Sequence, residues 1–269
     1  MSTIFDRPIT EIIKMRHSVR SYENKNIPEE IIKDIEGYIS TLDNPFNIKI
    51  RVKLMKNEDL NGKLKLGTYG VIKGARYFLA VSCEKEEFAL QALGYTFEKL
   101  VLYCTSLGFG TVWLGGTFTK GTFAKAMNLK ENEVLPIVSP LGYESGELSF
   151  LAKQFNKNTN KRKDYSEVFF NEEFSCGLTK EEAKEYAEVL EMVRLAPSAI
   201  NKQPWRILKQ GNTFHFYLEG SIKLKKIDIG IALCHFHLTA LEKGLNGEFK
   251  IEEPKINTKF NYVISWIEL

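Results

Sequence analysis

Two segments of the chain carry apolar side chains around almost the whole circumference of a helix: Ala89–Leu107 and Ile229–Leu241. A helix of this kind has to be covered by protein on every side. Neither segment contains the roughly 18 uncharged apolar residues in a row that a membrane span needs. The sequence therefore predicts two helices at the centre of a large hydrophobic core, and no segment that crosses a membrane.

Glycines recur at the same spacing around both segments, which predicts an internal repeat. In each pair the second glycine follows the first by 14 positions: Gly94 with Gly108, and Gly230 with Gly244. In both halves a predicted helix and strand precede the segment. We expect repeat 1 over residues 1–150 and repeat 2 over residues 151–269, with a polar, lysine-rich linker at 151–163.

Apolar periodicity and end signals predict two more helices. Pro28–Leu42 begins with a proline and two glutamates, and Thr179–Leu195 begins with a capping box and ends before Pro197. Short β-branched or aromatic runs predict strands. These strands are Ile48–Met55, Tyr77–Cys83, Glu133–Val138, Trp205–Lys209, Thr213–Leu218 and Tyr262–Trp266.

Charge and cysteine content exclude several kinds of partner and compartment. With 37 Lys+Arg against 34 Asp+Glu, the net charge of +3 is too small to indicate nucleic acid or an anionic membrane. The four cysteines form no C-x-x-C pair and no zinc-site spacing, which indicates a reducing compartment. Charged residues interrupt Met1–Ile13, where a signal peptide needs its apolar core. We therefore expect a cytoplasmic protein that acts on a small molecule.

Arg16, Ser18 and Arg20 alternate in a stretch predicted to be extended, so their side chains project from one side. Two guanidiniums and a hydroxyl in this arrangement suit a phosphate group, which accepts bidentate bonds from arginine. A solvated turn is the alternative interpretation of the same spacing.

A second candidate site follows the helix Thr179–Leu195, in the loop from Pro197 to Trp205. Its two prolines stiffen the backbone, and Ser198, Asn201 and Gln203 offer polar groups beside small residues. Such a loop suits a planar heterocycle that is bound along its edge. An ordinary helix-to-strand loop with a packed tryptophan is the alternative.

Two other patterns do not indicate a site. His235 and His237 would stand about 200° apart on a helix, so they cannot hold one metal ion together. Gly108 and Gly110 lack the third glycine of a dinucleotide fingerprint, and they follow a helix instead of a strand.

Together with Gly108–Gly116, the two candidate motifs resemble the flavin-dependent nitroreductase family. In that family R-x-S-x-R binds the phosphate end of FMN, P-S-x-x-N-x-Q-P-W lies along the isoalloxazine ring, and a W-x-G-G segment lies beside the ring. The resemblance covers most of the chain. It implies an α+β fold, a three-layer α-β-α sandwich with a mixed, mainly antiparallel sheet in each repeat, and FMN as cofactor.

The two motifs are divided between the halves, which is a departure from the family's usual homodimers with shared sites. R-x-S-x-R occurs only in the first half, and P-S-x-x-N-x-Q-P-W occurs only in the second. The chain is thus similar to a branch of the family in which two degenerate repeats form one polypeptide. This resemblance implies an intramolecular pseudo-dimer with one FMN, and hence a monomer.

The resemblance also implies ten cofactor-binding positions. The phosphate would be held by Arg16, Ser18 and Arg162, beside His17. Arg20 would reach the ribityl chain or the pyrimidine edge. The ring would be lined by Pro197, Ser198 and Asn201, and its N5 atom would face the backbone of Gly115 and Gly116. Leu114 stands where the family usually has an acidic residue. Lys65 and Tyr69 are the candidates for a further family contact before the second strand.

The activity that the resemblance implies is that of an FMN-dependent NAD(P)H oxidoreductase. NADH or NADPH would give hydride to flavin N5, and a nitroaromatic, quinone or similar acceptor would then receive it in a ping-pong cycle, with no catalytic side chain required. Two alternatives stay open: a flavin-binding protein without turnover, and other flavin chemistry on the same scaffold. The sequence identifies neither the acceptor nor the preferred nicotinamide.

Overall fold

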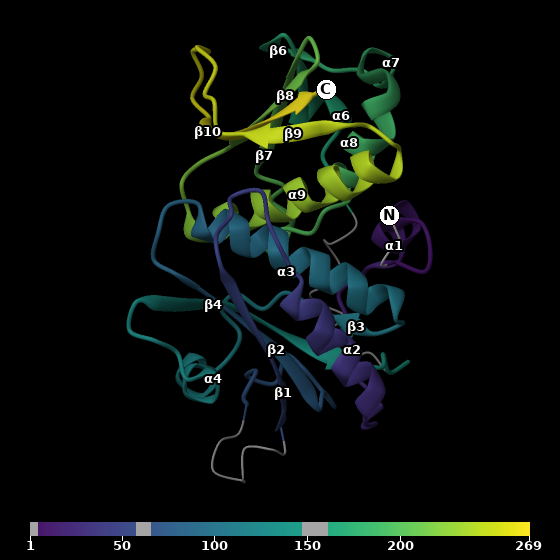
Figure 1. Ribbon diagram of the computed structural model, residues 1–269, viewed down its shortest axis with the longest axis vertical. Helices are drawn as coiled ribbons and strands as arrows, with labels where there is room; N and C mark the ends of the chain where they lie inside the picture. The colour runs from purple at the N-terminus through teal and green to yellow at the C-terminus, as the bar shows by residue number, and fades with distance from the viewer. Residues whose placement is uncertain (1–4, 58–65, 147–160) are drawn as a thin grey trace.

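Two β-sheets lie on either side of a pair of crossed helices (Figure 1). The computed structural model of the protein describes residues 5–57, 66–146 and 161–269. The central helices are α3 (Ala89–Ser106) and α9 (Lys223–Glu242), which contain the two segments that are apolar all round. Both are buried along most of their length, because each packs on one sheet and on the other helix.

The central helices approach each other most closely at Gly94 and Gly230. A Cβ on Gly94 would lie 2.1 Å from the carbonyl oxygen of Ile227, and a Cβ on Gly230 would lie 2.1 Å from that of Gln91. The contact is reciprocal, because each glycine faces the carbonyl three positions before the other glycine. Glycine is needed at both positions, since any side chain would collide with the backbone of the opposite helix.

Both central helices also end in the same way. Gly108 (φ +82) and Gly244 (φ +70) adopt the left-handed conformation. The following amide donates back to a carbonyl in the last turn, from Phe109 to Cys104 over 2.9 Å and from Leu245 to Ala240 over 3.0 Å. This is the Schellman arrangement, which explains why glycine recurs at this point in both halves.

The first sheet has the strand order β1-β2-β4-β3 and is antiparallel throughout. Its strands are β1 (Ile50–Lys56), β2 (Tyr77–Glu84), β3 (Gly110–Thr111) and β4 (Glu133–Gly142). The central strand β2 is buried on both faces: Leu79 and Val81 belong to the core around α3, whereas Phe78 and Ala80 pack towards α4 (Lys120–Met127). Helix α2 (Glu29–Ser40) packs against α3.

The second sheet has the order β6-β5-β7-β8-β10-β9, and only its β5–β7 pair is parallel. Its strands are β5 (Phe169–Asn171), β6 (Glu173–Gly177), β7 (Trp205–Gln210), β8 (Thr213–Leu218), β9 (Gly247–Lys250) and β10 (Asn261–Glu268). The run β7-β8-β10-β9 has the same order and pairing as β1-β2-β4-β3, and in both cases the central helix follows the second strand.

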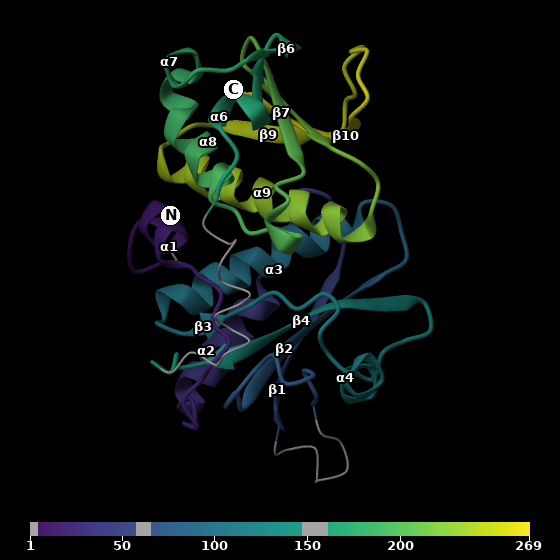
Figure 2. The ribbon, with the colours of Figure 1, turned by 180° about the vertical axis from the view of Figure 1, so that it is seen from behind.

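The outer faces of the two sheets are covered differently (Figure 2). Helix α4 covers the first sheet, with Phe123 against Phe78. On the second sheet, Phe216 faces α9, so its neighbour Tyr217 points outward, where it packs on Phe174. In the described part of the chain no counterpart of α4 lies there, so the α-β-α arrangement that we expected in each repeat is seen in the first half only.

The predicted elements are found, with two corrections to the helices. The helix expected over Thr179–Leu195 is broken into α7 (Lys180–Ala183), a 3-10 turn (Lys184–Tyr186) and α8 (Ala187–Arg194), because Lys184 has a φ of +52. The capping box of Thr179 and Glu182 is present. Helix α9 begins at Lys223, well before the expected start at Ile229.

Two short helices complete the fold around the central pair. Helix α1 (Ile9–Met15) packs against both α3 and α9, and α6 (Tyr165–Val168) precedes β5. Most of the expected linker, residues 151–160, lies outside the described residues. Within the ranges that the structure describes, no helix combines the length and apolar character needed to cross a membrane.

Candidate functional site

A cavity of about 480 Å³ lies between the two halves of the chain, beside the first turns of α9. The first half contributes the segment 16–20 and the loop 112–117, and the second half contributes Arg162, the loop 197–201 and α9. Nine of the ten expected site residues line this cavity: Arg16, Ser18, Arg20, Gly115, Gly116, Arg162, Pro197, Ser198 and Asn201. The structure thus brings together residues that are widely separated along the chain.

The segment 16–20 is extended, as its alternating residues predicted. Its backbone is fixed on both sides: Val19 donates to the carbonyl of Thr111 over 2.9 Å, and the carbonyl of Arg20 accepts from Lys73 over 2.9 Å. The Val19 side chain is buried against Gly110, on the side away from the cavity. Arg16, Ser18 and Arg20 consequently face the cavity.

Positive charge is concentrated in the part of the cavity wall where Arg16 and Arg162 lie near each other. Burial, together with the neighbouring charges of Arg16 and Arg194, lowers the pKa of Arg162 to about 10. Burial also lowers the pKa of Arg16, against the opposing effect of Glu98. The Nε atom of Arg16 finds no hydrogen-bond acceptor among the described residues. Close cations with an unused donor fit an anionic group such as a phosphate.

The loop 197–201 is held in a strained conformation. Ile200 and Asn201 have φ values of +46 and +56, although neither is glycine, and the side chain of Ile200 is 85% exposed. Arg162 donates to Asn201 Oδ1 over 2.7 Å, and Asn201 Nδ2 donates to the carbonyl of Lys161 over 2.7 Å. Such strain persists where surrounding contacts impose it, and it is frequent at binding sites.

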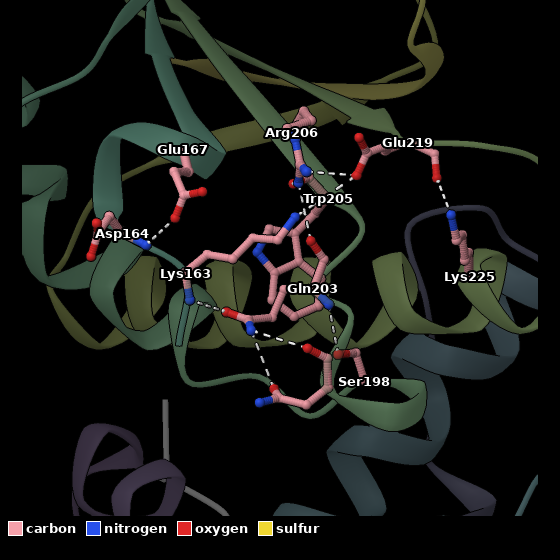
Figure 3. A network of polar contacts seen from close by, with 10 residues as sticks. Lys163, Asp164, Glu167, Ser198, Gln203, Trp205, Arg206, Glu219 and Lys225 are labelled. Atoms are coloured by element: carbon pink, nitrogen blue, oxygen red, sulfur yellow. Dashed lines mark hydrogen bonds and ion pairs between the residues drawn. The ribbon is translucent and has the colours of Figure 1, made fainter. Parts of the chain in front are cut away.

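Gln203 supports this loop from behind (Figure 3). Its amide N–H donates to Ser198 Oγ over 2.9 Å, and its side-chain oxygen accepts from the amide of Lys163 over 2.9 Å. Gln203 is almost fully buried and does not line the cavity. The sequence suggested that Gln203 offers polar groups to a ligand; in the structure these groups bind the protein itself.

Further polar contacts tie the same loop to β7, β8 and the start of α9 (Figure 3). The buried guanidinium of Arg206 donates to the carbonyl of Gln203 over 3.0 Å and to the Glu219 carboxylate over 2.6 Å. Lys225 donates to the carbonyl of Glu219 over 2.9 Å. The loop is therefore positioned by the second sheet and by α9.

A buried acid and histidine lie behind the cavity wall, and sequence reasoning did not pair them. Glu98 of α3 and His235 of α9 are both fully buried, with Glu98 Oε1 2.9 Å from His235 Nε2. The indole N–H of Trp113, which lines the cavity, donates to Glu98 Oε2 over 3.0 Å. His235 Nδ1 lies 2.8 Å from the carbonyl of Met192, which can only accept, so this nitrogen carries a proton.

Asp228 is a lining residue that sequence reasoning missed. It lies one turn beyond Leu224 on α9, and Leu224, Ile227 and Ile231 line the cavity with it. Burial raises the pKa of the Asp228 carboxyl to about 7, although the N–H of Ala199 and the charge of Lys225 lower it. In the sequence, Asp228 is a single acid among the apolar residues of one helix face, and this pattern could have indicated a site residue. It was not used because the helix was expected to begin at Ile229, after Asp228.

Residues 8–240 match the model of a protein family described as "Putative TM nitroreductase". The chain belongs to this nitroreductase family. The matched range contains every residue that lines the cavity.

Three individual proteins are similar to this chain over part or most of its length. A curated "Putative NADH dehydrogenase/NAD(P)H nitroreductase" of Methanothermobacter thermautotrophicus is 25% identical over 150 residues, which are 50% of this chain and 76% of the relative. A solved "putative nitroreductase" from Thermotoga maritima is 24% identical, with a TM-score of 0.65 over 97% of this chain and 94% of that one. An oxidoreductase that contains FMN is 15% identical, with a TM-score of 0.47 over 55% of this chain and 85% of its own. The Thermotoga protein thus shares the mixed α+β fold along nearly its whole length.

Two expected positions of this nitroreductase, His17 and Tyr69, are not part of the cavity wall. His17 points away from it: His17 Nε2 lies 2.8 Å from the carboxylate of Glu144, and Nδ1 lies 3.0 Å from the carbonyl of Met15. The expectation that His17 lies at the phosphate is therefore not met by this geometry. Tyr69 is 68% exposed and is not among the lining residues, and Lys65 lies outside the described residues.

Proposed function

We propose that this nitroreductase-family protein is an FMN-dependent NAD(P)H oxidoreductase, which transfers hydride from NADH or NADPH to a nitroaromatic, quinone or similar acceptor. The observation that carries the proposal is the cavity between the halves, whose wall contains three arginines as well as apolar residues of α9. FMN has a phosphate at one end and a planar ring at the other, so the residues present fit this cofactor.

In this proposal Arg16, Ser18 and Arg162 bind the phosphate, and Arg20 binds the ribityl chain or pyrimidine edge. The unused Nε donor of Arg16 and the like charge of Arg162 beside it support this role, because an anion would relieve both. Arginine is suited to the task since its planar fork matches phosphate oxygens.

The loop 197–201 and the two glycines after Leu114 would enclose the ring. Pro197, Ser198 and Asn201 would line one side, and Gly116 leaves room for a close approach, because a Cβ there would meet no atom within 4 Å. Bound FMN would supply hydride acceptance and donation at N5. The protein would orient nicotinamide and acceptor in turn, in the ping-pong order, while its apolar walls exclude water.

We further propose that the chain is an intramolecular pseudo-dimer of two repeats, residues 1–150 and 151–269. The recurring strand order and the reciprocal contact of Gly94 and Gly230 support this. When Gly94 and Gly230 are taken as equivalent positions of the two repeats, Phe88 is the equivalent of Leu224, and Gln91 is the equivalent of Ile227. Phe88 and Gln91 line a smaller pocket of about 210 Å³, whose described wall contains no arginine. We expect one FMN in each chain, and a monomer in solution.

FMN binding provides the first test. Arg16→Gln removes a charge-assisted hydrogen bond worth about 1.5–3 kcal/mol, so we expect FMN affinity to fall about 10- to 150-fold, with riboflavin affinity unchanged. Arg7→Gln, at an exposed arginine away from the cavity, is the matched control. Flavin fluorescence titration measures both affinities and the stoichiometry. Equal losses for FMN and riboflavin would contradict the phosphate assignment, and two FMN per chain would contradict the single site.

Turnover provides the second test. Anaerobic mixing with NADH or NADPH should bleach the flavin absorbance, and a quinone or nitroaromatic should restore it. A chain that binds FMN but leaves it oxidised with both nicotinamides would be a flavin-binding protein, and the oxidoreductase proposal would be wrong.

A further inference from the structure

Asp228 is placed in the cavity in a way that none of the roles above explains. The residue is only 4% exposed, although it lines the cavity. Its Oδ1 atom accepts a hydrogen bond from the amide of Ala199 over 3.0 Å. Its Oδ2 atom finds no donor in the described parts of the chain. One oxygen therefore fixes the carboxyl to the loop, and the other stays available to a bound molecule.

The surroundings of Asp228 favour its neutral form. Ile227 and Ile231 flank it on α9, so little water reaches the group. The cationic residues that share the cavity wall are Arg16, Arg20 and Arg162, and they come from other segments of the chain. Lys225 lies one turn earlier on α9, with its ammonium group bonded to the carbonyl of Glu219 over 2.9 Å. Burial outweighs the hydrogen bond from Ala199 and the charge of Lys225, and it raises the pKa of Asp228 to about 7.

The chemistry proposed for this cavity needs a proton as well as a hydride. Hydride transfer to a quinone brings two electrons and one proton, but the hydroquinone product contains two added protons. In water the second proton comes from solvent, but a cavity with apolar walls needs an internal donor. A general acid is most effective when its pKa lies near the working pH, which distinguishes Asp228 from an ordinary surface carboxylate.

We propose that Asp228 is the proton donor to the acceptor, and that Oδ2 is the atom that gives the proton. The proposal rests on the oxidoreductase function stated above. As hydride forms one new bond to the quinone, the Asp228 O–H bond breaks and its proton goes to the carbonyl oxygen that has gained electron density. The Asp228 carboxylate then takes a proton from water before the next cycle.

The test uses the variant Asp228→Asn, which keeps an oxygen for the Ala199 amide but has no acidic proton. Ferricyanide is the matched acceptor, because it takes electrons without a proton. We expect kcat with a quinone to fall about 100-fold, within the range that general acids contribute. With ferricyanide kcat should stay within about twofold, and so should the rate of anaerobic flavin reduction by NAD(P)H. Asp43→Asn, at an acid paired with Lys99 and away from the cavity, is the control substitution.

Two further measurements separate proton donation from a merely structural role. Quinone turnover by the wild-type protein should fall as pH rises through the neutral range, whereas Asp228→Asn should show a flat profile. FMN affinity, which fluorescence titration reports without turnover, should change less than about threefold. Equal losses with both acceptors, or a wild-type rate with quinone, would overturn the assignment of Asp228. Absence of wild-type turnover with either acceptor would overturn the proposed function, and this role with it.

Discussion

The Asp228 carboxyl should make the whole fold less stable as pH rises from about 4 to about 7. Its pKa is about 7 in the folded chain, because of burial, and about 3.9 in an unfolded chain. Between these values the folded chain binds one more proton at this group than the unfolded chain does, so the free energy of unfolding decreases with pH. Three pKa units correspond to about 4 kcal/mol, with no effect below pH 4 and the full loss above pH 7.

Asp228→Asn should remove this pH dependence, because the amide stays neutral. Relative to the wild type, the free energy of unfolding of the variant should therefore rise by about 3 kcal/mol between pH 5 and pH 8. Urea unfolding of the full-length chain, followed by tryptophan fluorescence, measures this difference. The series should be run as purified and with saturating FMN, so that a pH-dependent flavin affinity is separated from the effect of the carboxyl.

Asp43→Asn is a control with the opposite sign. Burial raises the pKa of Asp43, but the hydrogen bond and charge of Lys99 lower it more, so the net shift is downward. Removing this carboxylate should cost stability above pH 4 instead of adding it. The reasoning on Asp228 would be refuted if the difference between Asp228→Asn and the wild type changed by less than about 1 kcal/mol between pH 5 and pH 8.

Four other substitutions test particular parts of the structure. Gly94→Ala should destabilise the fold by about 3 kcal/mol or more in urea unfolding, because its Cβ would meet the carbonyl of Ile227. Gly37→Ala in α2, where a Cβ meets nothing, should instead stabilise by about 0.5–1 kcal/mol, and equal effects at the two sites would contradict the helix contact. His17→Ala should leave FMN affinity within about twofold in a fluorescence titration, since His17 does not line the cavity; a tenfold loss would return it to the phosphate site. Ile200→Gly should raise the thermal midpoint, because its left-handed backbone costs about 1–2 kcal/mol, and a lower midpoint would show that Ile200 is not strained.

The strands and central helices could be predicted because burial determines their sequence pattern. Residues of β2 alternate between two cores, and α3 is covered on all sides, so both are apolar without interruption. The strands that were missed, such as β3 with two residues, are defined by pairing with a neighbour and have little pattern of their own. The break at Lys184 was missed because it changes the backbone without interrupting the apolar spacing around it.

The candidate site was predictable where local geometry alone decides which way a side chain points. Side chains alternate along an extended segment, so Arg16 and Ser18 lie on one side of it. His17, between them, lies on the opposite side, where it contacts Glu144. Asp228 could not be identified in this way, because its burial depends on the loop that covers it. The pairing of Glu98 with His235 likewise depends on how α3 and α9 cross.

The glycine crossing of α3 and α9 has a consequence for how the cavity behaves on dilution. In a two-chain protein, half-sites on different subunits separate when the concentration falls below the dissociation constant of the dimer. Here the segment 16–20 and the loop 197–201 belong to one polypeptide, so each meets the other at an effective concentration that is set by the fold. This assembly stays complete at any protein concentration at which the chain is folded.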